Sequence, residues 1–174
     1  MIKFLIPLLF LSCQLSSQIV PENWEGKWKG TVKSWSYNTP IDSFEMSIDI
    51  IPKDTIWDFI IFYDRAYQGK PDIRAYQLII EDESKYHLAI DEKNSIFLDC
   101  FINDHCLYNK FSGMGSDLQV SMCVKGTKME YEITSYLSEP IRVSGNKVIE
   151  KDTIPEIKSF DLNFLMKAEL TKEQ

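Results

Sequence analysis

The segment that decides the fold is FDLNFLMKAEL, residues 160–170. Apolar residues occupy every second position, and polar or charged residues fill most of the others. The apolar set is Phe160, Leu162, Phe164, Met166, Ala168 and Leu170. A period of two residues is the pattern of a β-strand with one buried face and one face in water. The segment therefore predicts a long strand that packs one face against a core.

The same alternation recurs along most of the chain. In residues 43–51 the even positions are apolar, and similar runs occupy 86–90, 118–124 and 129–133. Short groups of Gly, Pro, Asn, Asp and Ser separate the runs, as turns require. We expect ten strands, near residues 26–36, 42–51, 56–63, 73–81, 85–91, 95–102, 106–112, 117–125, 128–137 and 157–170, and a further short strand within 141–149.

Short strands joined by tight turns predict an all-β domain, either a sandwich or a barrel. The barrel is favoured because an open meander leaves two edges with unpaired backbone groups. The apolar strand at 157–170 would form such an edge unless it paired with the first strand. We therefore predict a single antiparallel up-and-down β-barrel of about ten strands, with a two-layered sandwich as the alternative.

Residues 1–17 have the pattern of a cleaved signal peptide, with Lys3 ahead of the apolar segment 4–11 and small polar residues after it. Cleavage after Ser17 would leave the barrel domain, residues 18–174, as a soluble periplasmic or secreted protein. Alternatively, residues 10–13 resemble a bacterial lipoprotein box, in which a lipid on Cys13 anchors the protein to the cell envelope. We expect export by either route, and membrane contact only through Cys13.

The charge of the chain excludes one large class of partner. It has 26 acidic residues against 19 basic ones, for a net charge of −7, and its three arginines are dispersed. Nucleic-acid binding requires a clustered basic face. We therefore expect no nucleic-acid partner.

Three cysteines follow the signal segment: Cys100, Cys106 and Cys123. An odd number leaves at least one thiol unpaired in an exported protein. One possibility is a Cys100–Cys106 disulfide across a tight hairpin, and the alternative is that all three are small strand residues. The irregular spacing argues against a zinc site, and we expect no metal.

The first predicted strand contains Gly26-Lys27-Trp28, preceded by Asn23 and Trp24. This resembles the Gly-x-Trp signature that opens the first strand of lipocalins and related calycin barrels. The resemblance implies that Trp28 closes one end of the barrel, with a basic side chain from a late strand packed across it. Arg142 is the only late arginine, and the parity of Lys167 points outward.

The link at residues 37–41 is too short for the helical lid of intracellular fatty-acid binders, so the plan is most similar to the ten-stranded nitrobindin-type haem proteins. Those proteins use a late histidine for haem, and no histidine follows His105 here. We expect His87 to face outward and His105 to lie beside a turn. We therefore expect no haem or other cofactor.

Catalytic signatures are missing from the sequence. A nucleophilic serine or cysteine needs a neighbouring base, and the chain has two histidines. The stretch 112–116 is rich in glycine but has neither the spacing of a nucleophile elbow nor the lysine of a phosphate loop, so a turn is the simpler interpretation. We expect no enzymatic activity, unless a polar cluster lies inside the barrel.

We therefore expect an apolar barrel interior that binds a small hydrophobic molecule without covalent chemistry. The alternative is a barrel filled by its own large side chains, acting as an envelope or interaction module. The residues expected to line the site are Trp28, Phe44, Met46, Ile48, Tyr76, Leu78, Met122, Tyr131, Phe160, Phe164 and Met166.

Overall fold

The computed structural model describes residues 19–67 and 70–173. Its ten long strands are β1 (Gly26–Ser36), β2 (Thr39–Lys53), β3 (Ile56–Tyr67), β4 (Lys70–Asp82), β5 (His87–Asp91), β6 (Phe97–Asn103), β7 (Cys106–Gly113), β8 (Ser116–Lys125), β9 (Lys128–Ser144) and β12 (Ile157–Lys172). Two short strands, β10 (Lys147–Ile149) and β11 (Asp152–Ile154), form a separate hairpin. Helical structure in the described residues is limited to the single turns η1 (Glu22–Trp24) and η2 (Glu83–Lys85).

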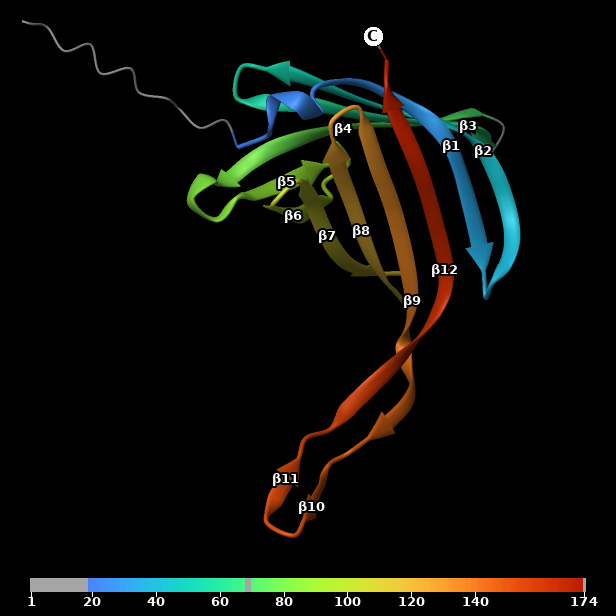
Figure 1. Cartoon of the computed structure of the whole chain (residues 1–174), viewed down its shortest axis with the longest axis vertical. Coiled ribbons are helices and arrows are strands. Elements are labelled where there is room, and N and C mark those ends of the chain that lie inside the picture. The colour runs from blue at the N-terminus through green and yellow to red at the C-terminus, as the bar shows by residue number, and fades with distance from the viewer. Residues whose placement is uncertain (1–18, 68–69, 174) are drawn as a thin grey trace, which may run out of the picture.

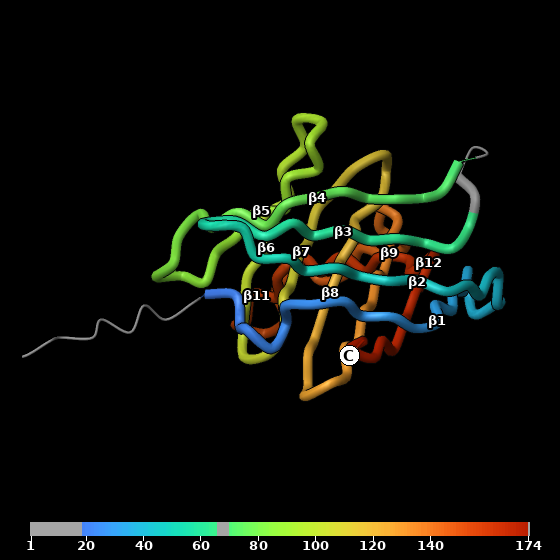
Figure 2. The backbone as a smooth tube through the Cα atoms, turned by 90° about the horizontal axis from the view of Figure 1, so that it is seen from above, coloured from blue at the N-terminus to red at the C-terminus, as the bar shows by residue number. Residues whose placement is uncertain are grey.

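The ten long strands form one closed antiparallel barrel, in the order β1-β12-β9-β8-β7-β6-β5-β4-β3-β2 (Figure 1). The closing pair is β1 with β12, in register from Trp28 opposite Lys172 to Trp35 opposite Leu165. Closure pairs both edges of the meander, which confirms the predicted barrel and excludes the sandwich. Seen from above, β1 to β4 run side by side along one wall (Figure 2).

Alternating side chains from these strands meet inside the barrel. On β2, Phe44, Met46, Ile48 and Ile50 are buried, whereas the residues between them are more exposed. The same holds for the end of β12, where Met166, Ala168 and Leu170 are buried. The two-residue period thus predicts correctly which face of these strands forms the core.

The short strand predicted within 141–149 is present as β10 (Lys147–Ile149). The residues before it belong to β9, which continues through Pro140 to Ser144. Proline is tolerated at an irregular position of a strand, and the register between β9 and β12 shifts beside the Pro140–Phe160 pair. The outer ends of β9 and β12 and the β10–β11 hairpin, residues 139–162, form a two-stranded arm that extends from the barrel (Figure 1).

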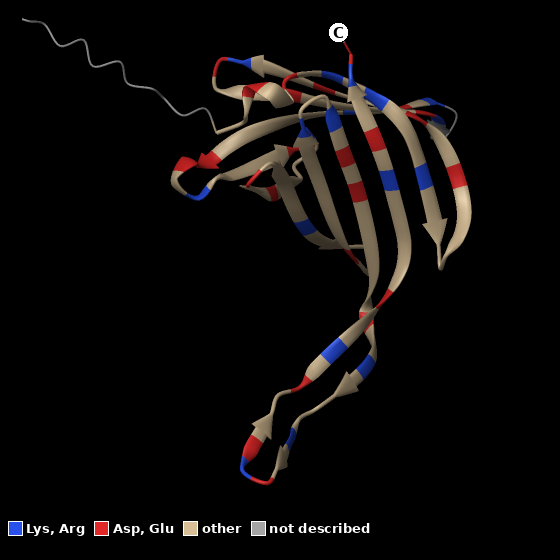
Figure 3. Cartoon of the chain, in the orientation of Figure 1, with Lys and Arg blue, Asp and Glu red and all other residues tan. Residues whose placement is uncertain are grey.

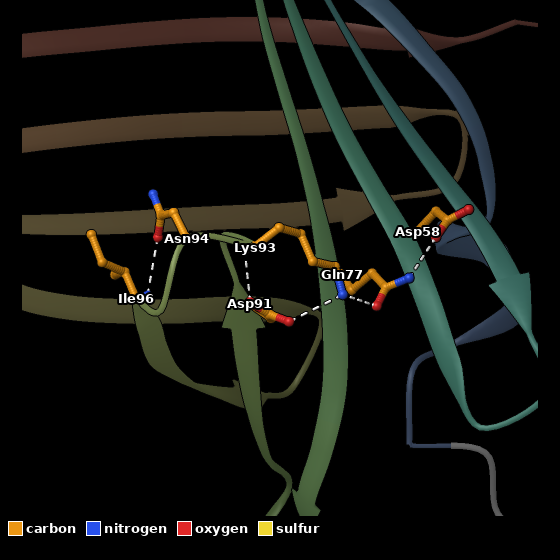
Figure 4. Close-up of polar contacts among 6 residues, drawn as sticks. All are labelled: Asp58, Gln77, Asp91, Lys93, Asn94 and Ile96. Carbon is orange, nitrogen blue, oxygen red and sulfur yellow. Dashed lines mark hydrogen bonds and ion pairs between the residues drawn. The ribbon is translucent and has the colours of Figure 1, made fainter.

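Hydrogen bonds between outward-facing polar side chains connect the β5–β6 turn to the neighbouring strands (Figure 4). The Gln77 amide donates to Asp58 at 3.0 Å, and the Lys93 ammonium donates to Gln77 and, at 3.0 Å, to Asp91. The hydrogen bond from Gln77 lowers the pKa of the Asp58 carboxyl, and the backbone N–H of Lys93 lowers that of Asp91. The network holds together β3, β4 and β5, which form part of the cavity wall described below.

The Cys100–Cys106 disulfide, one of the two possibilities considered from the sequence, does not form, and the three cysteines are not all free either. Cys106 on β7 is bonded to Cys123 on β8, with Cα atoms 4.0 Å apart, because these residues are directly opposite each other in the register. Cys100 is a buried free thiol whose Sγ donates to the Leu88 carbonyl oxygen at 3.4 Å. Cys13 lies outside the described residues, as does the whole predicted signal peptide.

We expect the Cys100 thiol to resist alkylation in the folded protein. Burial raises its pKa to about 12, and the thiolate is the reactive form. A raised pKa leaves less thiolate at neutral pH, and burial also keeps the reagent away from the sulfur. Iodoacetamide labelling followed by peptide mass spectrometry should leave the Cys100 peptide unmodified in buffer and modified in guanidinium chloride. Rapid labelling in buffer would contradict this prediction.

Candidate ligand-binding cavity

The barrel is closed at one end by Trp28 on β1. Its ring is fully buried, and its indole N–H donates to the backbone carbonyl of Trp24 at 2.8 Å. The ammonium of Lys172 lies 5.4 Å from the centre of the Trp28 ring and donates to the Asn23 carbonyl at 3.0 Å. A cation over the face of an indole ring is a favourable arrangement. The segment before β1 covers this end from outside, with Trp24 also buried.

Arg142 does not pack across Trp28 as expected. It lies on the arm, opposite Ser159, because β9 and β12 run on beyond the barrel. Lys172 takes this place because it lies directly opposite Trp28 in the β1–β12 register. Lys167 faces outward as its parity predicts, and it pairs with Glu132 at 2.7 Å.

The half of the barrel away from Trp28 contains a cavity of about 320 Å³. Most of its wall is apolar. The polar side chains come mainly from the second half of β3, the first half of β4 and the start of the β5–β6 turn, with one each from β7 and β9. The lining residues are Phe59, Ile61, Tyr63, Arg65, Arg74, Tyr76, Ile90, Glu92, Leu98, Leu107, Asn109, Phe111, Leu118, Val120, Met122, Tyr131, Ile133, Phe164 and Met166.

Two arginines enclose a buried carboxylate beside this cavity. Asp72 is 4% exposed and accepts a hydrogen bond from Arg74 Nε at 2.7 Å. Arg65 Nε lies 3.5 Å from the other carboxylate oxygen, an ion pair without a hydrogen bond. The guanidinium of Arg65 also lies 4.7 Å from the centre of the Phe44 ring. The Glu92 carboxylate also lines the cavity and acts on Tyr76, so the two cations and two anions on this side balance.

Three tyrosines bring hydroxyl groups to the same cavity. Burial raises the pKa of Tyr131 well above its ordinary value, and it also raises the pKa values of Tyr63 and Tyr76. A hydrogen bond joins the side chains of Tyr63 and Tyr131. Because a raised pKa keeps a phenol protonated at neutral pH, these groups are neutral hydrogen-bond donors and acceptors.

Five of the residues predicted to line the site do line the cavity: Tyr76, Met122, Tyr131, Phe164 and Met166. Trp28, Met46, Ile48 and Leu78 are fully buried in the core but outside the cavity wall, and Phe44 packs edge-on against Tyr63. Phe160 does not line the site. It is 39% exposed because its part of β12 belongs to the arm, so alternation there does not face a core.

The polar side of the cavity was not among the predicted lining residues. Asp72 and Arg74 share their parity with Tyr76 and Leu78 on β4, both of which were predicted to face inward. Extending that alternation by two positions each time would have placed them inside. Their charge argued against an inward position, because charges are buried only when they are paired.

The two histidines lie away from the cavity. His87 faces outward, stacked on Phe101 at 4.6 Å and bonded to Asp99 at 2.7 Å. His105 lies beside the β6–β7 turn and bonds to Asp104. In residues 19–67 and 70–173, no group of three His, Cys, Asp or Glu side chains is placed to hold a metal ion. The helical turns of this part of the chain are too short and polar to cross a membrane.

Two larger hollows lie on the outside of the barrel. One, of about 450 Å³, follows the outer face of β6 to β9 around Phe101 and Tyr108. The other, of about 1,030 Å³, lies beside the N-terminal segment and the β2–β3 turn. Both exceed the interior cavity in volume, but their surroundings include outward-facing charged side chains. We regard the interior cavity as the candidate site because the barrel walls surround it and its polar groups converge.

Comparison with solved structures shows a similar fold. The crystal structure of Rv2717c from M. tuberculosis matches over 88% of this chain and 94% of that chain, with a TM-score of 0.49 and 10% sequence identity. No family model and no curated protein matches the sequence. At 10% identity the similarity concerns the fold alone.

Proposed function

We propose that this protein binds a small, mostly apolar molecule in the interior cavity. The observation that carries the proposal is the 320 Å³ cavity within a barrel whose other half is solidly packed. Ligand pockets generally measure about 300–1,000 Å³ and combine an apolar lining with a few polar groups. A volume at the lower end of that range favours a compact ligand over a long lipid chain.

The polar groups would orient this ligand. Phe111, Leu118, Val120, Ile133 and Phe164 offer an apolar surface for its body. The tyrosine hydroxyls and the two guanidinium groups offer hydrogen-bond donors for a polar end. The proposed ligand is therefore amphipathic, held mainly by burial at roughly 25 cal/mol per Å² of apolar surface.

We propose binding without catalysis. The tyrosine hydroxyls are held in their protonated form, which makes them poor bases. Asp72 is paired with both arginines and is therefore poorly placed to accept a proton from a substrate.

We further propose that binding takes place outside the cytoplasm. The signal-peptide pattern of residues 1–17 and the Cys106–Cys123 disulfide support this, because disulfides persist in oxidising compartments. The intact mass of the protein from its own host distinguishes a chain cut after Ser17 from one lipidated at Cys13. An uncut chain recovered from the cytoplasm would contradict export.

Native mass spectrometry of the protein purified from its own host should show a bound small molecule. A fluorescent apolar probe should bind saturably and be displaced by that molecule. If nothing co-purifies and the probe does not saturate, the filled-barrel alternative, an envelope or interaction module, replaces this proposal.

Val120→Trp should weaken probe binding at least tenfold. Val120 lies in the cavity wall opposite Ile133, and the larger ring would occupy part of the space available to the ligand. Titration of the fluorescent probe measures the change in Kd.

Gln119→Trp is the matched control, because the neighbouring side chain is exposed on the outer face of the same strand. It introduces the same ring and should leave the probe's Kd unchanged. Equal binding by both variants would place the probe elsewhere on the molecule.

A further inference from the structure

The arm, residues 139–162, is an unsupported part of the molecule. It consists of the outer ends of β9 and β12 and the β10–β11 hairpin, and it extends away from the barrel (Figure 1). Its strands pair with each other, Ile157 with Ser144 and Lys147 with Ile154, but with no third strand in the described residues. An isolated two-stranded ribbon is marginally stable in water, and its edges offer unpaired backbone groups.

The arm also exposes apolar side chains. These are Ile141 (67% exposed), Val143 (54%), Val148 (67%), Ile149 (56%), Ile157 (53%), Phe160 (39%) and Leu162 (41%). Single exposed apolar residues are ordinary, but a gathering of this kind marks an interaction surface. A partner could therefore bury the exposed apolar side chains of the ribbon and could also pair with the backbone groups at its edges.

We propose that the arm is a dimerisation element that packs against the arm of a second copy of this chain. The exposed apolar side chains lie on both faces of the ribbon, because Ile157 pairs with Ser144 whereas Lys158 pairs with Val143, so the second arm would have to enclose the ribbon.

The charge of the arm fits a second copy. It has four basic residues, Arg142, Lys147, Lys151 and Lys158, and five acidic ones, Glu139, Glu150, Asp152, Glu156 and Asp161. Both signs alternate along the ribbon (Figure 3), so its net charge is near zero while the whole chain has −7. In a two-fold pair the same patch meets itself, so mixed signs can be complementary where a surface of one sign would repel. The five acidic side chains disfavour an anionic membrane as the partner.

The test is sedimentation velocity of the purified full chain over a wide concentration range. The wild type should be a dimer, and the double variant Ile149→Lys/Ile157→Lys should weaken the dimer at least a hundredfold and sediment as a monomer. Both side chains are more than half exposed, so the barrel should keep its circular dichroism spectrum and Tm.

The matched control is Ile41→Lys/Ile73→Lys. These isoleucines are 54% and 55% exposed, close to the values for Ile157 and Ile149, but lie outside the arm. The control adds the same charge and should remain a dimer.

A wild type that is monomeric throughout would overturn the proposal, as would a dimer that survives the arm variant or is lost equally in the control. Vesicles of phosphatidylethanolamine and phosphatidylglycerol complete the experiment. Vesicle binding by a monomeric wild type, lost in the arm variant, would assign the arm to membranes instead.

Discussion

Trp28→Ala is expected to lower the free energy of unfolding by about 3–5 kcal/mol, the usual cost of truncating a large buried aromatic side chain. The ring is fully buried, and its removal would leave a void at the closed end of the barrel. It would also leave the Trp24 carbonyl without the indole N–H and Lys172 without the ring beneath it. Guanidinium chloride denaturation, followed by circular dichroism, measures the loss.

Trp35→Ala is the control for this prediction. Trp35 is on the same strand but is only half-buried, after the bulge at Ser34 and Trp35. Its truncation should cost less than half as much as that of Trp28. Two outcomes would show that Trp28 does not close the end of the barrel: an equal loss of unfolding free energy in both variants, or a loss of less than about 1 kcal/mol in Trp28→Ala.

The barrel could be predicted from the sequence because side-chain alternation is a local property. Each run such as 43–51 shows by itself which face is buried, and the short turns leave few ways to connect the runs. Closure follows from the cost of two open edges, and the β1–β12 pairing confirms it.

Register is the property that the sequence does not show. Whether Cys106 meets Cys100 or Cys123 depends on which residues are opposite each other across two hairpins, and a shift of one position changes the pairing. For the same reason the sequence did not identify Lys172 as the cation that packs on Trp28, since this follows only from its position opposite Trp28 in the register.

The polar side of the cavity and the arm were missed for a different reason. Asp72 and Arg74 have inward parity, but their charge suggests an exposed position until the Arg65 partner is known. Conversely, Phe160 continues the apolar alternation of β12, but it lies in the arm, where there is no core for that face to pack against. Pattern reasoning assumes that apolar means buried, and it fails where the molecule exposes apolar residues.

Gly30→Val is expected to destabilise the barrel by more than about 3 kcal/mol, above the usual cost of overpacking a core. Gly30 lies between Met46 on β2 and Leu170 on β12, at the seam where the barrel closes. A Cβ atom there would overlap the backbone carbonyl oxygen of Glu169 and lie 3.1 Å from the Leu170 Cα. Backbone atoms cannot rotate away as a side chain can, so β1 and β12 would have to separate locally. Urea denaturation should show the loss of stability.

Gly113→Val separates this effect from strand propensity. Gly113 ends β7, its φ is negative, and a Cβ added there meets no atom within 4 Å. Valine prefers an extended backbone more strongly than glycine does. This variant should therefore be as stable as the wild type or slightly more stable. A large loss in both variants would point to the glycines' flexibility, whereas loss in Gly30→Val alone shows that barrel closure depends on a close approach of two backbones that only glycine permits.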